Sequence, residues 1–275
     1  MKPDVVTPLS ELGVLRVAGP DSRRFLQGQL SNDLERLDLE PGLRAGLHSP
    51  QGRVIAILQL FPSGEDVLAV TAAELVAPVV AHLRRYLLRA KARVEDAGAT
   101  YRVLGISDDS GRRLSLLPAD QALPEGQPGS VRDWQAADIA AGLAQVGLAT
   151  SGQFVAQMLN LDHAGGISFT KGCYTGQEII ARAHYRGRVK RRAQRFEIDK
   201  EPDLVPGQRV RLADGRTADI VNAVRLEDGR QECLAVTALP DSSTDPGSAE
   251  AGAMSGNEKA VSSRALPLPY ALDEG

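Results

Sequence analysis

Residues 157–195, QMLNLDHAGGISFTKGCYTGQEIIARAHYRGRVKRRAQR, form the stretch that decides the fold of this chain. At its centre, residues 171–178 (KGCYTGQE) place a cation, a thiol, an amide and a carboxylate in one short segment, typical of a turn followed by a helix. Two glycines in this segment allow a ligand to approach the backbone closely. If the helix begins near Thr175, its N-terminus and Lys171 would both favour the thiolate of Cys173. The segment therefore predicts a site with a reactive thiol.

A purely structural interpretation of the same residues stays open. Cys173 could be a small buried hydrophobe, and Glu178 a favourable charge at a helix N-terminus. The four histidines are scattered, and no HExxH motif or Cys/His spacing indicates zinc, so we predict no bound metal. The chain also lacks a P-loop, a GxSxG motif and a GxGxxG motif after a strand. The nucleotide triphosphatase, hydrolase and dinucleotide-binding classes therefore have no support.

The KGCYTGQE run resembles the KGCYxGQE signature of the YgfZ family, folate-binding relatives of the glycine-cleavage T-protein that support iron–sulfur proteins. The resemblance extends over most of the chain. It includes NLD at 160–162, GGISF at 165–169, AR at 181–182, RG at 186–187, KR at 190–191, GPDSRRFLQGQLSND at 19–33, SPQGRV at 49–54 and LPLPYAL at 266–272.

This resemblance implies an α+β fold: a T-protein-like multidomain ring with ferredoxin-like α+β domains and a C-terminal β-barrel around a central channel. We expect residues 1–45 and 125–190 to form a discontinuous folate-binding domain, interrupted by a second α+β domain at 46–124. Residues 191–275 would form the barrel. Within them, 241–264 is rich in Ser, Gly and Ala without an aromatic residue, which predicts mobility, and the apolar tail after it is expected to dock back.

The resemblance also implies the site residues. Trp134, the only tryptophan, stands where a folate-contacting tryptophan is expected, although an ordinary core tryptophan is the alternative. Some family members carry a second tryptophan where this chain has Leu12 and Gly13. The remaining folate-binding residues would come from the central motif and the helix after it, with Cys173 as the reactive thiol. They are Lys171, Gln177, Glu178 and Arg182.

A basic stretch follows the central motif and contains no acid. Its basic residues are Arg182, Arg186, Arg188, Lys190, Arg191, Arg192 and Arg195. They could bind a polyglutamate tail, a phosphate backbone or an acidic protein, and Tyr185 would suit stacking on a base. A solvated strand edge that discourages aggregation is the structural alternative.

The N-terminal part predicts a small α+β layer. Alternation at 13–19 indicates a strand, and 53–61 and 67–71 indicate a hairpin. Apolar residues recur at helical intervals over 75–87, after a capping-box pattern at 71–74. Pro78 falls inside this helix, which either bends there or begins later.

Two further regions complete the expected organisation. A strand is expected near 101–107, and the loop-rich residues 110–130 predict a connection rather than a core element. After Arg195, the dipeptides Asp214-Gly215 and Asp228-Gly229 predict tight hairpin turns in a small β-barrel or sandwich.

The bulk properties narrow the function classes. The chain has 275 residues, 43% of them hydrophobic, and a formal net charge of -3, which argues against a surface wholly committed to nucleic acid or membrane. Its two cysteines suggest no disulfide framework or CxxC pair, and its N-terminus does not read as a signal peptide. We expect a cytoplasmic monomer without a membrane span.

The leading hypothesis is a folate-dependent accessory protein for the assembly or repair of iron–sulfur clusters in client enzymes, including those that thiolate tRNA. One alternative is a one-carbon (aminomethyl) transferase that uses tetrahydrofolate, the class expected if the chain is an enzyme at all. Another is a tRNA-binding module. The expected partners are a folate, iron–sulfur client enzymes and tRNA.

Overall fold

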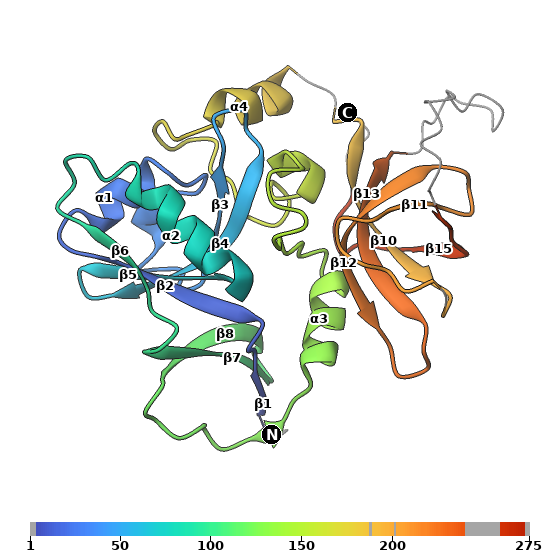
Figure 1. Ribbon diagram of the computed structural model, residues 1–275, viewed down its shortest axis with the longest axis horizontal. Helices are drawn as coiled ribbons and strands as arrows, with labels where there is room; N and C mark the ends of the chain where they lie inside the picture. Colours follow the sequence, from blue (N-terminus) through green and yellow to red (C-terminus); the bar gives the residue numbers. More distant parts are fainter. Residues whose placement is uncertain (1–3, 187–188, 201, 240–258, 273–275) are drawn as a thin grey trace.

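A five-stranded antiparallel sheet forms the first layer of the computed structural model, which describes residues 4–186, 189–200, 202–239 and 259–272 (Figure 1). Its strand order is β3-β4-β5-β2-β6. The strands are β2 (Leu12–Ala18), β3 (Leu43–His48), β4 (Val54–Ser63), β5 (Asp66–Ala72) and β6 (Arg93–Asp96). The short helices that accompany it are α1 (Ser22–Gln27), η1 (Leu34–Arg36), η2 (Ala73–Leu75) and α2 (Val76–Arg84). The predicted first strand and the β4–β5 hairpin are confirmed.

The predicted capping box is wrong, and this settles the position of Pro78. Thr71 belongs to β5, and Glu74 accepts a hydrogen bond from the backbone N–H of Leu148 at 2.6 Å instead of capping a helix. Helix α2 begins at Val76, so Pro78 lies in its first turn. Backbone N–H groups there have no partner within the helix, and a proline costs little. The helix therefore begins later than the pattern indicated.

A four-stranded sheet with the order β8-β7-β1-β9 forms a second layer. Its strands are β1 (Val5–Pro8), β7 (Tyr101–Asp108), β8 (Gly111–Pro118) and β9 (Gln127–Pro128). Strand β7 confirms the prediction near 101–107, but β8 corrects the prediction of a mere connection at 110–130. Strand β8 pairs with β7 along its whole length, and its Leu114 and Leu116 pack against a buried cluster. The polar and turn-forming residues around these two leucines had indicated a loop.

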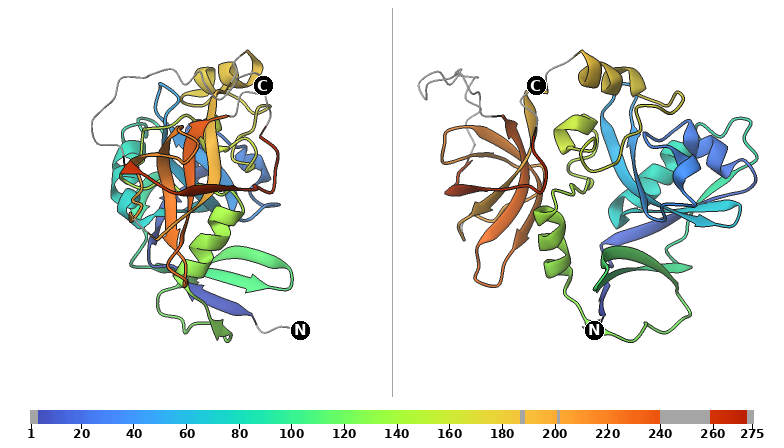
Figure 2. Two further views of the ribbon diagram at one scale, coloured as in Figure 1. Left: turned by 90° about the vertical axis from the view of Figure 1, so that its right-hand side faces the viewer. Right: turned by 180° about the vertical axis from the view of Figure 1, so that it is seen from behind.

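The chain then passes from the sheets to the barrel through α3 (Val131–Ala140), η3 (Ala156–Leu159) and α4 (Gln177–Tyr185). Helix α3 lies between the N-terminal sheets and the C-terminal strands, as Figure 1 and the reverse view in Figure 2 both show. It contacts β1 on one side and β12 and β13 on the other. Any space beside α3 is therefore bordered by distant parts of the sequence.

The C-terminal strands form a sheet with the order β14-β11-β12-β13-β10-β15. They are β10 (Arg191–Ile198), β11 (Arg209–Arg211), β12 (Thr217–Arg225), β13 (Gln231–Ala238), β14 (Lys259–Ala260) and β15 (Ser263–Leu266). Gly215 and Gly229 adopt φ of 86° and 87° in the β11–β12 and β12–β13 turns, confirming both predicted hairpins.

A short stretch of chain joins the two edges of this sheet, as expected for a curled, barrel-like sheet. Ala260 pairs with Arg211 at one edge, and Ser263 pairs with Ile198 at the other. Because Ala260 and Ser263 are three residues apart, they lie within about 11 Å of each other. The sheet must therefore curl until one short stretch of chain joins both edges.

This closure also corrects part of the predicted mobile segment. Residues 240–258 lie outside the described residues, but the end of the predicted segment is ordered in strands β14 and β15. Backbone pairing and burial of Val261 offset the low apolar content that suggested mobility.

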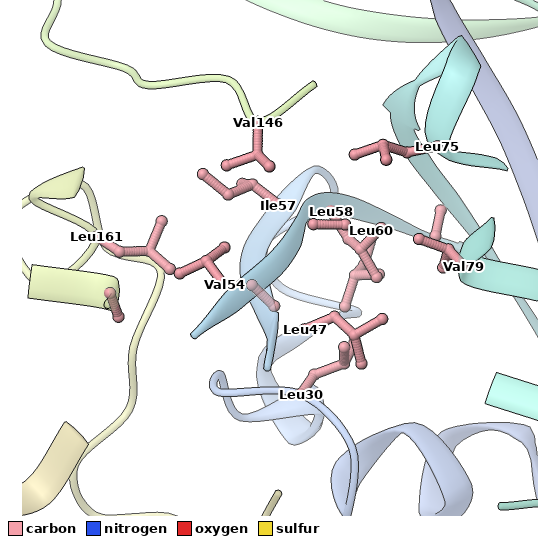
Figure 3. Close-up of a cluster of buried hydrophobic side chains, with 14 of the residues drawn as sticks. Leu30, Leu47, Val54, Ile57, Leu58, Leu60, Leu75, Val79, Val146 and Leu161 are labelled. Carbon is pink, nitrogen blue, oxygen red and sulfur yellow. The ribbon is translucent and has the colours of Figure 1, made fainter. Parts of the chain in front are cut away.

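The predicted boundary at residue 45 falls inside strand β3, and the sheet built from residues 12–96 runs continuously across it. One buried cluster joins this sheet to η3, α4 and the barrel strands. Figure 3 shows part of it, with side chains from β3, β4, α2 and the irregular chain gathered together. Among the helices of the described ranges, none has both the length and the apolar character needed to cross a bilayer.

Candidate functional site

A cavity of about 410 Å³ lies where α3 separates the N-terminal sheet from the barrel. Its walls come from the start of β2, the β5–η2 junction, α3, the chain after α3 and strand β12. The lining residues that bear on its chemistry are Glu11, Leu12, Glu74, Trp134, Gln135, Asp138, Ile139, Gln145, Val221 and Asn222. A volume of this size, with apolar walls and a few polar groups, is typical of a small-molecule site.

Trp134 is both a cavity wall and a core residue. Its side chain is only 8% exposed and packs with the buried cluster between the two N-terminal sheets. Gly105 of β7 leaves room for the ring, since a Cβ there would lie 2.4 Å from it. Leu12 lines the same cavity. The contact of Trp134 with a folate stays a prediction.

Two partly buried carboxyl groups give the cavity its electrostatic character. Burial raises the pKa of Asp138 above its usual value, against the opposing effect of Arg112, whose Nη2 donates to Oδ1 at 3.0 Å. Burial also raises the pKa of Glu11, and the nearby charge of Asp138 acts in the same direction. No lysine or arginine is among the described lining residues. The cavity therefore presents acceptors and acids rather than cations.

Asp138 and Arg112 were missed by the sequence analysis. Asp138 follows Trp134 by four residues, a spacing that places both side chains on one face of a helix. This signal was present in DWQAAD. Arg112 carried no such signal because it belongs to β8, which had been interpreted as part of a connection.

Lys171 does not line this cavity, and its ammonium group uses all three of its hydrogen-bond donors on the protein. Its ammonium group donates to the backbone carbonyls of Gln27, Leu30 and Asn32 at 2.7, 2.7 and 2.8 Å. Burial lowers its pKa to about 8, with Asp33 opposing that shift. This lysine therefore fixes the chain after α1.

The central motif and the SPQGRV turn form one structural unit. Gly176 precedes α4 with φ of 82°, and a Cβ on it would lie 2.6 Å from the carbonyl oxygen of Ser49. A Cβ on Gly52 would lie 2.8 Å from Ile179. This close packing fixes the start of α4 on the β3–β4 turn, and Cys173 is left exposed just before it. The interpretation of Cys173 as a buried hydrophobe is therefore wrong.

The structure does not bring the two predicted halves of the site together. Gln177 is half-buried, and Glu178 and Arg182 are exposed on α4. None of these, nor Lys171 or Cys173, is among the residues that line the cavity with Trp134. The motif instead lies where α4 packs on the β3–β4 turn, outside the cavity lining.

The basic stretch is partly neutralised by acids from other segments. Three ion pairs account for this: Arg191 with Asp219 at 2.7 Å, Arg192 with Asp162 at 3.0 Å, and Arg195 with Glu232 at 2.7 Å. Arg182, Arg186 and Lys190 are exposed and form no ion pair within the described ranges. Arg188 lies outside the described residues. The predicted basic field is therefore limited to the end of α4 and the chain after it.

The C-terminal tail docks as predicted. The hydroxyl of Tyr270 donates to the carbonyl of Gly142 at 2.9 Å and accepts from Asn160 at 3.3 Å. Its ring stacks on His163 with centroids 5.2 Å apart. The tail thus ties the barrel to the chain on both sides of η3.

Comparison with known proteins supports the resemblance along the full chain. No family model matches it. A tRNA-modifying protein YgfZ of Hamiltonella defensa is 29% identical over 274 residues, covering 82% of this chain and 81% of that protein. The protein of the same name from Escherichia coli O157:H7 is 27% identical over 321 residues, covering 99% and 95%.

The solved structures similar to this chain include a glycine cleavage system aminomethyltransferase T from Bartonella henselae. Its TM-score is 0.58 at 13% identity, over 86% of this chain and 79% of that one. The likeness confirms the predicted T-protein-like α+β fold. The KGCYTGQE signature, the similarity to curated YgfZ proteins along the chain and this shared fold together support the resemblance to the YgfZ family.

Proposed function

We propose that this protein binds a folate in the cavity beside α3 and acts as an accessory protein in tRNA modification. The curated relatives carry the name tRNA-modifying protein, and the fold is shared with an aminomethyltransferase of glycine cleavage. The observation that carries the proposal is the cavity itself, in which the Trp134 ring and the buried Asp138 carboxyl line one space. We also propose a cytoplasmic monomer.

The residues of the cavity fit the pterin end of a folate. A pterin is a flat ring that gains from an aromatic or apolar wall, which Trp134, Leu12 and Ile139 supply. Its donor edge offers adjacent N–H groups, and a carboxylate can accept two parallel hydrogen bonds from such an edge. Asp138 and Glu11 can accept in this way, whereas Glu74, the third carboxyl among the described lining residues, already accepts from the backbone of Leu148. Without a lining cation, the glutamate tail adds less affinity than the pterin.

The finer part of the proposal is a role in assembling or repairing iron–sulfur clusters of client enzymes. Cys173 is exposed beside α4 and can be reached by a partner protein, whereas Cys233 is buried. One thiol cannot hold a stable cluster, which normally needs four protein ligands. The described residues contain no group of three or more His, Cys, Asp or Glu side chains placed to hold a metal ion. Clients would therefore contribute the other ligands.

Titration of tetrahydrofolate against the fluorescence of Trp134 tests the folate proposal directly. We expect saturable quenching, and similar quenching by a tetrahydropterin that lacks the glutamate tail. Because this is the only tryptophan, the signal reports on the cavity alone. Binding measured by calorimetry without any change in Trp134 emission would place the folate elsewhere, and absence of binding would remove folate from the proposal.

A one-carbon transferase is the second candidate. The buried Asp138, whose pKa is raised by burial, favours it because such a carboxyl can act as a general acid or base at a cavity wall. Purified protein supplied with tetrahydrofolate and an aminomethyl donor distinguishes the two. An accessory protein shows no turnover, and sustained turnover lost in an Asp138→Asn variant would establish the transferase.

A further inference from the structure

Three aromatic rings gather at the end of α4 and form a surface that the folate cavity does not use. The rings of Phe169 and His184 are stacked, with centroids 3.8 Å apart and planes 14° apart. Tyr185 meets both of them edge-on, at 6.3 Å from Phe169 and 4.7 Å from His184. We call these three residues the aromatic cluster.

The aromatic cluster is anchored in the protein by one ring and exposed to solvent through the other two. Phe169 is partly buried against the main hydrophobic cluster, so it anchors the other two rings. His184 is exposed, and Tyr185 is 67% exposed, far more than a tyrosine needs for its hydroxyl to reach water. Tyr185 belongs to none of the buried clusters. A large ring exposed to solvent at the end of a helix suits contact with another flat ring.

Three exposed cations flank the aromatic cluster along the chain. Arg182 lies one turn before Arg186 at the end of α4, and Lys190 follows before β10. All three are exposed, and none forms an ion pair in the part of the chain that the structure describes. This differs from Arg191, Arg192 and Arg195, which acids neutralise. The only acid in α4 is Glu178, at the opposite end of the helix.

We propose that the aromatic cluster and these three cations bind a single-stranded segment of RNA, with a base stacked on Tyr185 or His184 and phosphates at Arg182, Arg186 and Lys190. Aromatic rings combined with unpaired cations match the two parts of an exposed nucleotide, a flat base and an anionic backbone. An acidic protein would need the charges but not a solvent-facing ring stack. The choice of RNA rests on the proposed function, because the relatives are named for tRNA modification.

The aromatic cluster is close in the chain to the exposed thiol of Cys173. Phe169 and the exposed Cys173 are four residues apart, so their Cα atoms lie within about 14 Å of each other. An RNA held on the aromatic cluster would therefore lie near the chain segment that carries Cys173.

Fluorescence anisotropy with a labelled single-stranded oligoribonucleotide of about 12 residues, and with an unmodified tRNA transcript, tests the proposal. Tyr185→Ala is expected to weaken binding at least about fivefold, whereas Tyr185→Phe retains it because stacking needs the ring and not the hydroxyl. Combined Arg186→Ala and Lys190→Ala should lower the slope of log affinity against log salt by about 1.4, since each phosphate contact on a single strand contributes about 0.7.

Tyr86→Ala is the matched control. Tyr86 is also exposed, lies 5.3 Å from the ring of a histidine (His82) at a tilt of 40°, and follows a helix with basic residues, but that helix is α2. The Tyr86→Ala variant should bind RNA with the affinity of the wild type. Equal losses in Tyr86→Ala and Tyr185→Ala, an unchanged affinity in Tyr185→Ala, or displacement of the RNA by polyglutamate at the same charge concentration would each overturn the proposal.

The Trp134 titration separates this proposal from the folate proposal. In Tyr185→Ala, tetrahydrofolate should quench Trp134 as in the wild type, which also shows that the variant is folded. Wild-type protein that binds tetrahydrofolate but no RNA would overturn the RNA proposal alone. Protein that binds RNA through Tyr185 but no tetrahydrofolate would overturn the folate proposal alone.

Discussion

The guanidinium group of Arg112 lies over the indole of Trp134, with its Cζ atom 4.0 Å from the ring centroid. The same side chain donates to the backbone carbonyl of Trp134 at 2.8 Å and to Asp138 at 3.0 Å. One arginine from β8 thus fixes both the aromatic wall and the buried carboxyl of the cavity. The cavity is therefore arranged before any ligand enters.

Asp138→Asn should weaken tetrahydrofolate binding about tenfold or more, as measured by quenching of Trp134. The physical reason is the loss of a charged acceptor for the pterin edge, since hydrogen bonds to charged groups contribute about 1.5–3 kcal/mol. Asp133→Asn is the control, because Asp133 lies on the same helix but is exposed. Similar affinities in both variants would remove Asp138 from the site.

Affinity for tetrahydrofolate should also fall in acid. Burial raises the pKa of Asp138 from its ordinary value of 3.8, so this carboxyl takes up a proton at a higher pH than an exposed aspartate. A protonated carboxyl accepts the pterin edge less strongly. A plot of log affinity against pH should therefore decline as the pH falls through the raised pKa, and Asp138→Asn should flatten that decline. A decline that is identical in the variant would assign the titration to another group.

Lys171→Met should destabilise the fold by about 2–3 kcal/mol in chemical denaturation, because three carbonyl groups lose their donor together. Between pH 8 and 10.5 the unfolded chain binds more protons at this lysine than the folded chain does, since burial lowers its pKa to about 8. The stability of the wild type relative to the variant should therefore rise with pH across this window. A stable variant that cannot bind folate would instead support the predicted ligand role of Lys171.

His48→Leu should make the protein less sensitive to acid. His48 is fully buried, and burial lowers its pKa from 6.5 to about 4. Between these values the unfolded chain binds more protons at His48 than the folded chain, so stability is lost as the pH falls through this window. The loss amounts to about 3 kcal/mol in the wild type and should be absent from the variant. Parallel denaturation curves for both proteins at pH 7 and pH 4.5 measure the difference.

Cys173→Ser should leave folding and folate affinity close to those of the wild type but abolish rescue of iron–sulfur enzyme activity in cells that lack the protein. The reason is that Cys173 is exposed while Cys233 is buried. Cys233→Ala is the control, expected to cost roughly 1 kcal/mol of stability and to preserve rescue. Burial raises the pKa of the Cys233 thiol to about 12, so it is not a nucleophile near neutral pH. Full rescue by Cys173→Ser would remove this thiol from the mechanism.

The family resemblance, the α+β class and the principal strands could be predicted from the sequence, because each depends on local information. Alternating apolar residues predict β2 and the β4–β5 hairpin, and glycine turns predict the barrel hairpins. The linked positions of KGCYTGQE carry the resemblance to the YgfZ family without any contact. Trp134 lines the cavity, and its contact with a folate stays a prediction.

Only the tertiary structure decided which of these residues meet. The sequence placed Lys171 and Trp134 in one pocket, but three backbone carbonyls near α1 hold the lysine, and β8 supplies Arg112 beside the indole instead. Likewise, the sequence indicated free charges at Arg191, Arg192 and Arg195. In the fold they form ion pairs with Asp219, Asp162 and Glu232. Burial, ion pairing and cavity walls all depend on segments far apart in the chain, and their partners are set by packing rather than by sequence spacing.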